Sequence, residues 1–269
     1  ISLMMDLIFD LGCKTESYLE RQEAYSFYTA GLSAQFEVIN PVDSSEIKLA
    51  YGVGTRSLAR FAPNASSLIS EALCTPKFND SDRIKDLISQ VSSSMMDSLA
   101  HRGHIYAMMA AKAQISSIGV CNERTNGLSF MHWLKKCDEL MRSPKEVERI
   151  IQKFVNLHQS MNQIPSKGIV VTDQPDIQKE MVFEFVKGQN PLQTYSGPKM
   201  KREKIAWIGD LQVSYCALAT RVENITHKNA PALTLISSIL TNGFLHRVIR
   251  EQGGAYGGGC SYQSKTGEL

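Results

Sequence analysis

Arg250 and Tyr256 are the residues of this sequence best placed to do chemistry, because they flank the run Gly253, Gly254 and Ala255. Glycine lets another polypeptide backbone approach closely, since no Cβ stands in the way. Phosphate loops place their glycines before a helix, at its positive end, whereas these glycines follow a predicted helix. The pattern therefore favours contact with an extended polypeptide over contact with a phosphate.

A predicted helix over residues 230–252 must position this pair. Apolar residues recur in it at helical spacing, which predicts a well-buried helix with Arg250 in its last turn. Gly253 and Gly254 end the helix, because glycine readily takes the left-handed conformation of a C-cap. A plainer interpretation stays open, in which Arg250 complements the helix dipole and Tyr256 only packs its ring.

Histidine spacing gives no sign of a metal site in the chain. Spacing at i and i+4 places two histidine ligands for zinc on one face of a helix, as in the motif H-x-x-E-H. The sequence has six histidines, and none is followed at the required distance by Glu-His. We therefore predict no metal ligands in this chain.

The run 242–259, NGFLHRVIREQGGAYGGG, resembles the C-terminal signature of the presequence-protease branch of the pitrilysin/insulinase zinc metallopeptidases. Weaker matches upstream occur in the order of that family, at Leu11-Gly12, at 103–113 and at 126–134. The resemblance implies a clamshell peptidase that encloses unfolded peptides, with zinc bound by the N-terminal half and this chain in the C-terminal half. It also implies that Tyr256 donates a hydrogen bond to the developing oxyanion, that Arg250 fixes the substrate backbone, and that Gly253, Gly254 and Ala255 leave room for the substrate.

The fold implied is α+β, with two related domains, each a mainly antiparallel sheet with helices packed on one face. The proline at 165 suggests a boundary, giving units 1–165 and 166–269, the first without its opening strands and the second without its closing portion. The sequence patterns predict strands at 32–39, 47–53, 168–172, 204–208 and 212–219, and helices at 1–11, 18–28, 62–73, 80–99, 104–116, 128–140, 143–157, 175–186 and 230–252.

Composition limits the classes of partner that we expect for this chain. With 29 basic and 27 acidic residues, the chain has no charge footprint for nucleic acid or an anionic membrane, and no run reaches the roughly 20 apolar residues of a membrane span. Six cysteines without a C-x-x-C pair favour reduced thiols in an intracellular compartment. The expected partners are the N-terminal half of the same enzyme and unfolded peptides, in the mitochondrial matrix or a bacterial cytoplasm.

Two functional alternatives remain open at this stage. The first is a metalloendopeptidase whose isolated C-terminal half is inactive. The second is a non-catalytic member of the superfamily that serves as a structural or substrate-presenting subunit. The presence of both Arg250 and Tyr256 favours the first, but the motif that decides lies outside this sequence.

Overall fold

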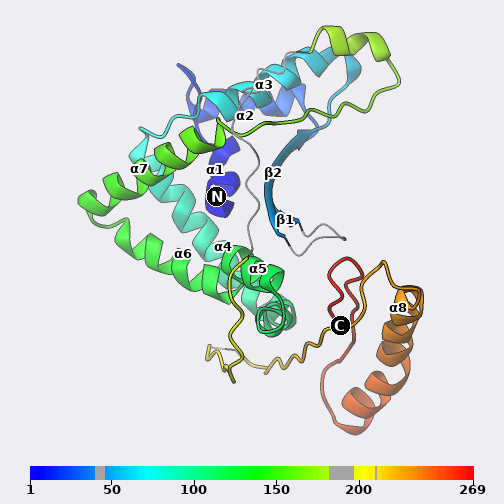
Figure 1. Ribbon diagram of the computed structural model, residues 1–269. Coiled ribbons are helices and arrows are strands. Elements are labelled where there is room, and N and C mark those ends of the chain that lie inside the picture. Colours follow the sequence, from blue (N-terminus) through cyan, green and yellow to red (C-terminus); the bar gives the residue numbers. More distant parts are fainter. Residues whose placement is uncertain (40–45, 182–196, 210) are drawn as a thin grey trace. The chain divides into compact units, whose positions relative to one another are not determined.

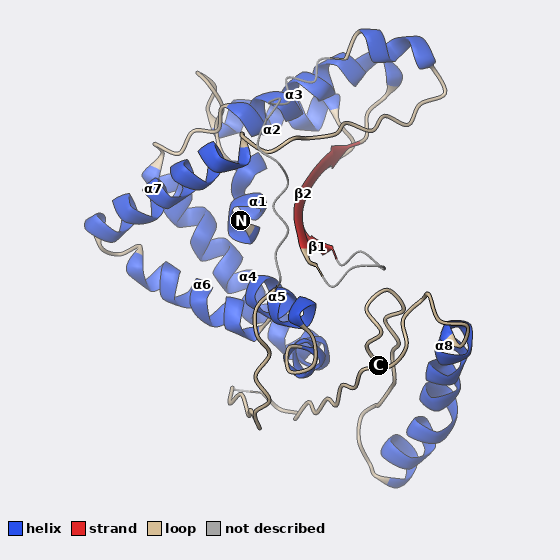
Figure 2. Ribbon diagram, viewed as in Figure 1, coloured by secondary structure: helices blue, strands red, loops and turns tan. Residues whose placement is uncertain are grey.

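The computed structural model describes residues 1–269 except 40–45, 182–196 and 210, and it combines helices with one small antiparallel sheet (Figures 1 and 2). The class is therefore α+β, as predicted. The helices are α1 (Ser2–Leu7), η1 (Ile8–Asp10), α2 (Tyr18–Tyr28), η2 (Ala59–Phe61), α3 (Ala62–Cys74), α4 (Ser81–Lys112), α5 (Ser117–Asn126), α6 (Leu128–Leu140), α7 (Pro144–Met161), η3 (Pro175–Lys179), α8 (Ala230–Ile239) and η4 (Leu240–Gln252). The strands are β1 (Leu32–Ile39) and β2 (Lys48–Thr55).

The chain divides into two compact units that are interleaved in sequence. Unit 1 comprises Ile1–Glu37, Leu49–Asp97 and Phe130–Gln193, and unit 2 comprises Val38–Lys48, Ser98–Ser129 and Thr194–Leu269. The predicted domains, 1–165 and 166–269, were expected to have related folds. The division into compact units does not test that expectation, so it stays a prediction.

Unit 1 is built around the apolar helix α1. Leu3, Met4, Met5 and Leu7 are each at most 3% exposed. They belong to a core that also takes residues from α3, α4, α6 and α7, and Figure 1 shows α1 among these helices. Each fully buried side chain of this kind contributes about 1.5 to 3 kcal/mol to folding. The predicted helix at 1–11 is thus confirmed in its main part, as α1 followed by the turn of η1.

Helix α2 and the β1–β2 hairpin follow the predicted pattern closely. A capping box begins α2, in which Ser17 Oγ accepts from the backbone N–H of Glu20 and the Glu20 carboxylate accepts from that of Ser17. Gly31 then turns the chain with a φ of +99°, a value that favours glycine. Alternate residues of β1 are exposed, as the period of two predicts. The predicted turn at 40–43 lies outside the described residues.

Arg21 on α2 is a buried cation of unit 1, with 1% of its surface exposed. Its Nη1 donates to the carboxylates of Glu71 at 2.7 Å and Glu16 at 3.1 Å. Its Nη2 donates to the Leu68 carbonyl at 2.7 Å and to the Tyr25 hydroxyl at 3.1 Å. One guanidinium therefore joins α2 to α3 through four acceptors, and no part of this cluster was predicted from the sequence.

Helix α4 corrects the prediction of two helices at 80–99 and 104–116. The structure has one helix that continues through Gly103. A single glycine costs a helix only about 1 kcal/mol, and no proline or cap stands nearby to end it. In unit 2 the ring of Tyr215 packs where a Cβ at position 103 would lie, and its hydroxyl donates to the Ala100 carbonyl at 2.7 Å. The glycine therefore serves close packing rather than a helix end.

The strands predicted in the C-terminal third are wrong. Within the described residues, 168–172, 204–208 and 212–219 run without strand pairing. Their apolar side chains face solvent, with Val171, Ile208 and Leu218 each above 90% exposed. A β-branched pattern alone does not make a strand, because a strand also needs a neighbour to pair with, and none is provided in the described part of the chain. The helix predicted at 175–186 is only the short η3, and its residues from 182 onward are not described.

Glu123 is a buried carboxylate at the junction of α5 and α6 in unit 2. It is 6% exposed, and its Oε1 accepts from the backbone N–H of Ser129 at 3.0 Å and from the Ser129 hydroxyl at 3.2 Å. Its other oxygen, Oε2, has no hydrogen-bond partner among the described residues. Burial raises the pKa of this carboxyl above its ordinary value, against the lowering effect of the bonds from Ser129 and of the Leu128 backbone.

The raised pKa predicts how stability changes with pH at this position. A carboxyl whose folded pKa exceeds its unfolded pKa stabilises the fold below the unfolded pKa, and this contribution is lost as pH rises through the folded pKa. We therefore expect wild type to lose stability relative to Glu123→Gln as pH rises from the unfolded pKa of a glutamate, about 4.3, through the higher pKa of the folded state. The measurement is denaturant unfolding of both proteins across that range. The exposed Glu139→Gln is the matched control, and an equal pH dependence in both variants would refute the role of burial.

Candidate functional site

The candidate site is the segment 250–259 of unit 2, which comprises the last residues of the long helix α8–η4 and the turn after it and is called loop 250–259 below. Asn229 precedes α8, and Pro231 lies in the first turn, where its missing N–H costs nothing. The helix then runs without a break to Gln252, as predicted, although its second part is π-helical. The His246–Glu251 pair, at 3.3 Å from Nδ1 to Oε1, joins residues five positions apart, which suits the wider π-helical turn.

Backbone hydrogen bonds fix the turn after the helix. The N–H groups of Gly253, Gly254 and Ala255 donate to the carbonyls of Val248, Arg250 and Ile249, at 3.0, 3.1 and 3.1 Å. Gly254 has a φ of +71°, which confirms the left-handed turn expected of this glycine pair, whereas Gly253 keeps a helical φ of −86°. The three amides are engaged in the turn, so only their carbonyls and their lack of bulk are free for a ligand.

A side-chain clamp closes the far end of the loop. The Thr241 hydroxyl accepts from the backbone N–H of Cys260 at 2.9 Å and lies 3.0 Å from the Cys260 carbonyl oxygen. The chain from η4 to Cys260 is therefore a loop anchored at both ends to one helix. Nothing in the sequence indicated this clamp, because threonine and cysteine 19 positions apart form no known motif.

Arg250 and Tyr256 both face solvent. Tyr256 is 95% exposed, and among the described residues its hydroxyl has no hydrogen-bond partner and Arg250 has no ion pair. A Cβ built on Gly254 or Gly257 would meet no atom within 4 Å, so the surface beside the tyrosine is open. The structure thus places Arg250 in the last turn of the helix and Tyr256 on the anchored loop that follows, and no hydrogen bond or cation–π pair joins the two side chains in the described structure.

The burial predicted for the helix is wrong. Along Ala230–Gln252 only 6% of the most apolar 18-residue window is buried, and Leu235, Ile239 and Phe244 are each more than half exposed. An 18-residue stretch of this helix has a mean hydropathy of 1.3, so the helix is long and apolar enough to cross a membrane by length and composition alone, whereas no run of membrane-spanning length was expected from the sequence.

Metal ligands do not gather in the described part of the chain. No group of three or more His, Cys, Asp or Glu side chains lies close enough together there to hold a metal ion. The six cysteines are free thiols. The residues that the structure describes therefore do not fit a zinc ion, and no step involving zinc is assigned to them.

Known relatives identify the class of protein. Residues 1–137 match the family model described as peptidase M16 (subfamily C) associated. The chain is 28% identical to the mitochondrial presequence protease of Saccharomyces cerevisiae, covering 99% of this chain and 28% of that protein. It is 26% identical to the enzyme of the same name from Kluyveromyces lactis, over 99% of this chain and 29% of that protein, and 24% identical to that of Drosophila melanogaster, over 97% and 26%.

These findings confirm the resemblance that the 242–259 run carried. The chain spans little more than a quarter of the length of these relatives. The matched model covers just over half of the sequence and includes most of the core of unit 1. The chain therefore belongs to the family of peptidase M16 (subfamily C) associated proteins.

Proposed function

We propose that this chain is a part of the C-terminal half of a zinc metalloendopeptidase that degrades unfolded peptides of the targeting-peptide type in an enclosed chamber. The observation that carries the proposal is similarity along 99% of the chain to proteins named presequence protease. Each of these relatives is named as mitochondrial, which favours the mitochondrial matrix over a bacterial cytoplasm. In this proposal the two predicted domains, 1–165 and 166–269, are related α+β units, and their sheets are completed by parts of the protein outside this sequence.

Loop 250–259 gives the chain its part in the reaction. The Tyr256 hydroxyl is free to donate a hydrogen bond to the substrate oxygen on which negative charge develops, and Arg250 is free to hold a backbone carbonyl of the peptide. The open space at Gly254 and Gly257 admits an extended backbone beside them. Because the loop is anchored by the turn and by the Thr241–Cys260 clamp, both side chains start from a fixed backbone.

Zinc belongs to the other half of the protein in this proposal. When bound there, it would supply a polarised carbonyl and a water of lowered pKa. The residues of this chain would orient the peptide and stabilise charge, and neither task requires a local metal ligand. Nucleic acid and membranes are not among the proposed partners.

Complementation tests the proposal directly. Hydrolysis of an unfolded, basic, amphipathic peptide is measured with the intact protein, with the 269-residue chain alone, and with that chain mixed with the remainder of the protein. We expect activity in the intact protein and in the mixture, loss on chelation with recovery on added zinc, and none in the chain alone. A folded, zinc-loaded intact protein without activity would instead favour the non-catalytic subunit, and activity in the chain alone would overturn the division of labour.

A further inference from the structure

A pocket lies in unit 1 between helices α1, α6 and α7, and the proposed function makes no use of it. Its cavity volume is about 270 Å³, slightly below the range of about 300 to 1,000 Å³ common for small-molecule sites. The pocket is lined by Leu3 of α1, by Trp133, Lys136, Cys137 and Leu140 of α6, and by Glu146, Arg149, Ile150, Lys153 and Phe154 of α7. The size suits one alkyl chain or one ring.

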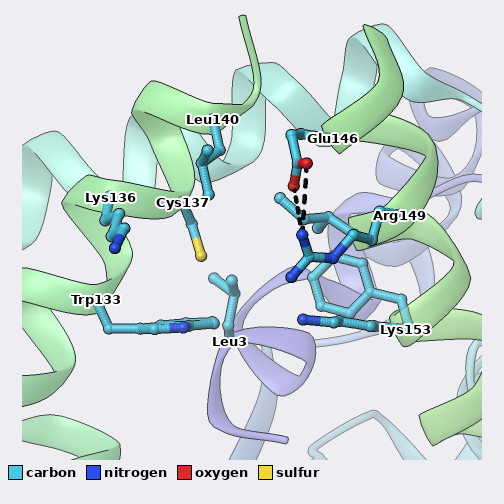
Figure 3. Close-up of a pocket in the computed structure, with 10 residues that line it drawn as sticks. Leu3, Trp133, Lys136, Cys137, Leu140, Glu146, Arg149 and Lys153 are labelled. Carbon is cyan, nitrogen blue, oxygen red and sulfur yellow. Dashed lines mark hydrogen bonds and ion pairs between the residues drawn. The ribbon is translucent and has the colours of Figure 1, made fainter. Parts of the chain in front are cut away.

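The interior of the pocket is apolar. Leu3, Cys137 and Phe154 form buried parts of the wall, at 3%, 7% and 7% exposed. The Trp133 indole, 48% exposed, stacks on Phe130 with ring centroids 5.6 Å apart, so one edge of the pocket is a flat aromatic surface. In Figure 3 the Cys137 sulfur and the Leu3 side chain point into the space between α6 and α7. Such a surface favours an apolar ligand body.

Positive charge surrounds this apolar interior. Lys136 stands on the α6 side and Lys153 and Arg149 on the α7 side, with the ends of the last two directed toward the space (Figure 3). Arg149 is paired with Glu146 at 3.1 Å. Neither lysine has a carboxylate partner among the described residues, so the rim carries two uncompensated ammonium groups. Burial raises the pKa of the Cys137 thiol and Lys153 partly opposes that rise, which is consistent with a position of Lys153 close to the pocket wall.

From this arrangement we propose that the α1–α6–α7 pocket binds a small amphiphilic anion, an alkyl or aryl group that carries one carboxylate. The apolar body lies against Leu3, Phe154 and Trp133, and the carboxylate lies at the rim between Lys136 and Lys153. An alkylammonium of equal length is disfavoured by the same two lysines. The site is independent of loop 250–259, so it stands or falls separately from the peptidase proposal.

Decanoate, used below its micelle concentration, is the probe. Equilibrium dialysis with the intact protein measures its binding, with hexanoate and decyltrimethylammonium as comparisons. Each methylene lost from the ligand removes part of its transfer free energy, so hexanoate is expected to bind on the order of 100-fold more weakly. Lys136→Gln and Lys153→Gln are each expected to weaken decanoate binding about two- to fivefold, and together about tenfold. Lys135→Gln, the exposed neighbour on α6 that does not line the pocket, is the matched control and should change nothing.

Alkylation of Cys137 locates the ligand. Its rate, followed by mass spectrometry of the modified peptide, should fall about tenfold when decanoate is present at about ten times its Kd. Cys216, which is exposed and lies in unit 2, should react at an unchanged rate in the same sample. Equal protection of both cysteines, protection of neither, equal binding of decyltrimethylammonium, or wild-type affinity in the double lysine variant would each overturn the proposal.

Discussion

In the intact protein, Tyr256→Phe is expected to lower the turnover of an unfolded peptide by about 100- to 1000-fold. This is the usual loss when one preorganised donor to a developing oxyanion is removed. The substitution keeps the ring and removes only the hydroxyl, which has no internal partner in the described structure, so the fold should be unaffected. Because the bond forms mainly in the transition state, kcat should fall while KM changes little. Steady-state kinetics with a single-site peptide measures both.

Tyr262 offers a matched control for that experiment. It follows the same loop, but its hydroxyl is already engaged, donating to the Glu223 carbonyl at 2.7 Å. Tyr262→Phe should therefore lower stability by about 1 kcal/mol and leave kcat near the wild-type value. If Tyr256→Phe is as active as wild type, the plainer interpretation of Tyr256 as a surface aromatic holds. Arg250→Lys then separates charge from geometry, because lysine keeps the cation but lacks the planar fork.

Arg21→Met is expected to destabilise unit 1 by about 3 kcal/mol. Removing one member of a buried ion pair typically costs about 3 to 5 kcal/mol, because the remaining charge is left without its partner. The lower end applies here because Glu71 is 24% exposed and keeps Lys14 at 3.1 Å. Methionine fills much of the arginine volume, so the loss reports the bonds to Glu16, Glu71, Tyr25 and Leu68 rather than a cavity. Denaturant unfolding followed by circular dichroism gives the free energy.

Two further variants make the interpretation of Arg21 specific. Glu71→Gln in the Arg21→Met background should recover part of the loss, since it removes the carboxylate that the first change leaves uncompensated. Lys85→Met breaks an exposed pair with Asp82 and should cost less than about 1 kcal/mol. Equal losses from Arg21→Met and Lys85→Met would show that the buried guanidinium contributes no more than a surface charge.

Periodicity predicted the helices well because their apolar stripes find partners within the chain. The segments 62–73, 128–140 and 143–157 were recognised in this way and lie within a residue or a few of α3, α6 and α7. The break predicted between 99 and 104 was wrong, because Gly103 lies inside one helix and admits the Tyr215 ring, and a long-range contact of this kind leaves no local signal. Helix α5 was missed in the sequence. Its N-cap residue, Ser116, directly follows the apolar run of the preceding helix and was taken as the end of that helix.

The site residues could be singled out from the sequence only because glycine, arginine and tyrosine stand in a short run that resembles a known signature. The solvent exposure of Tyr256 and the clamp from Thr241 to Cys260 depend on contacts across 19 residues, which local propensity does not encode. The segments wrongly predicted as strands at 168–172, 204–208 and 212–219 were misread for a related reason. A strand pattern states what a segment can do, and pairing depends on a neighbour elsewhere in the protein.

The position of α1 in the core has a consequence for biosynthesis. This helix buries Leu3 and Met4 in a cluster that is completed by Val147, Phe154 and Met161 of α7, which the ribosome adds much later. At about 5 to 20 residues per second, the nascent chain holds α1 without that cover for roughly 7 to 30 s. A holding chaperone that binds short apolar segments would thus find a recognition sequence in α1 throughout that interval.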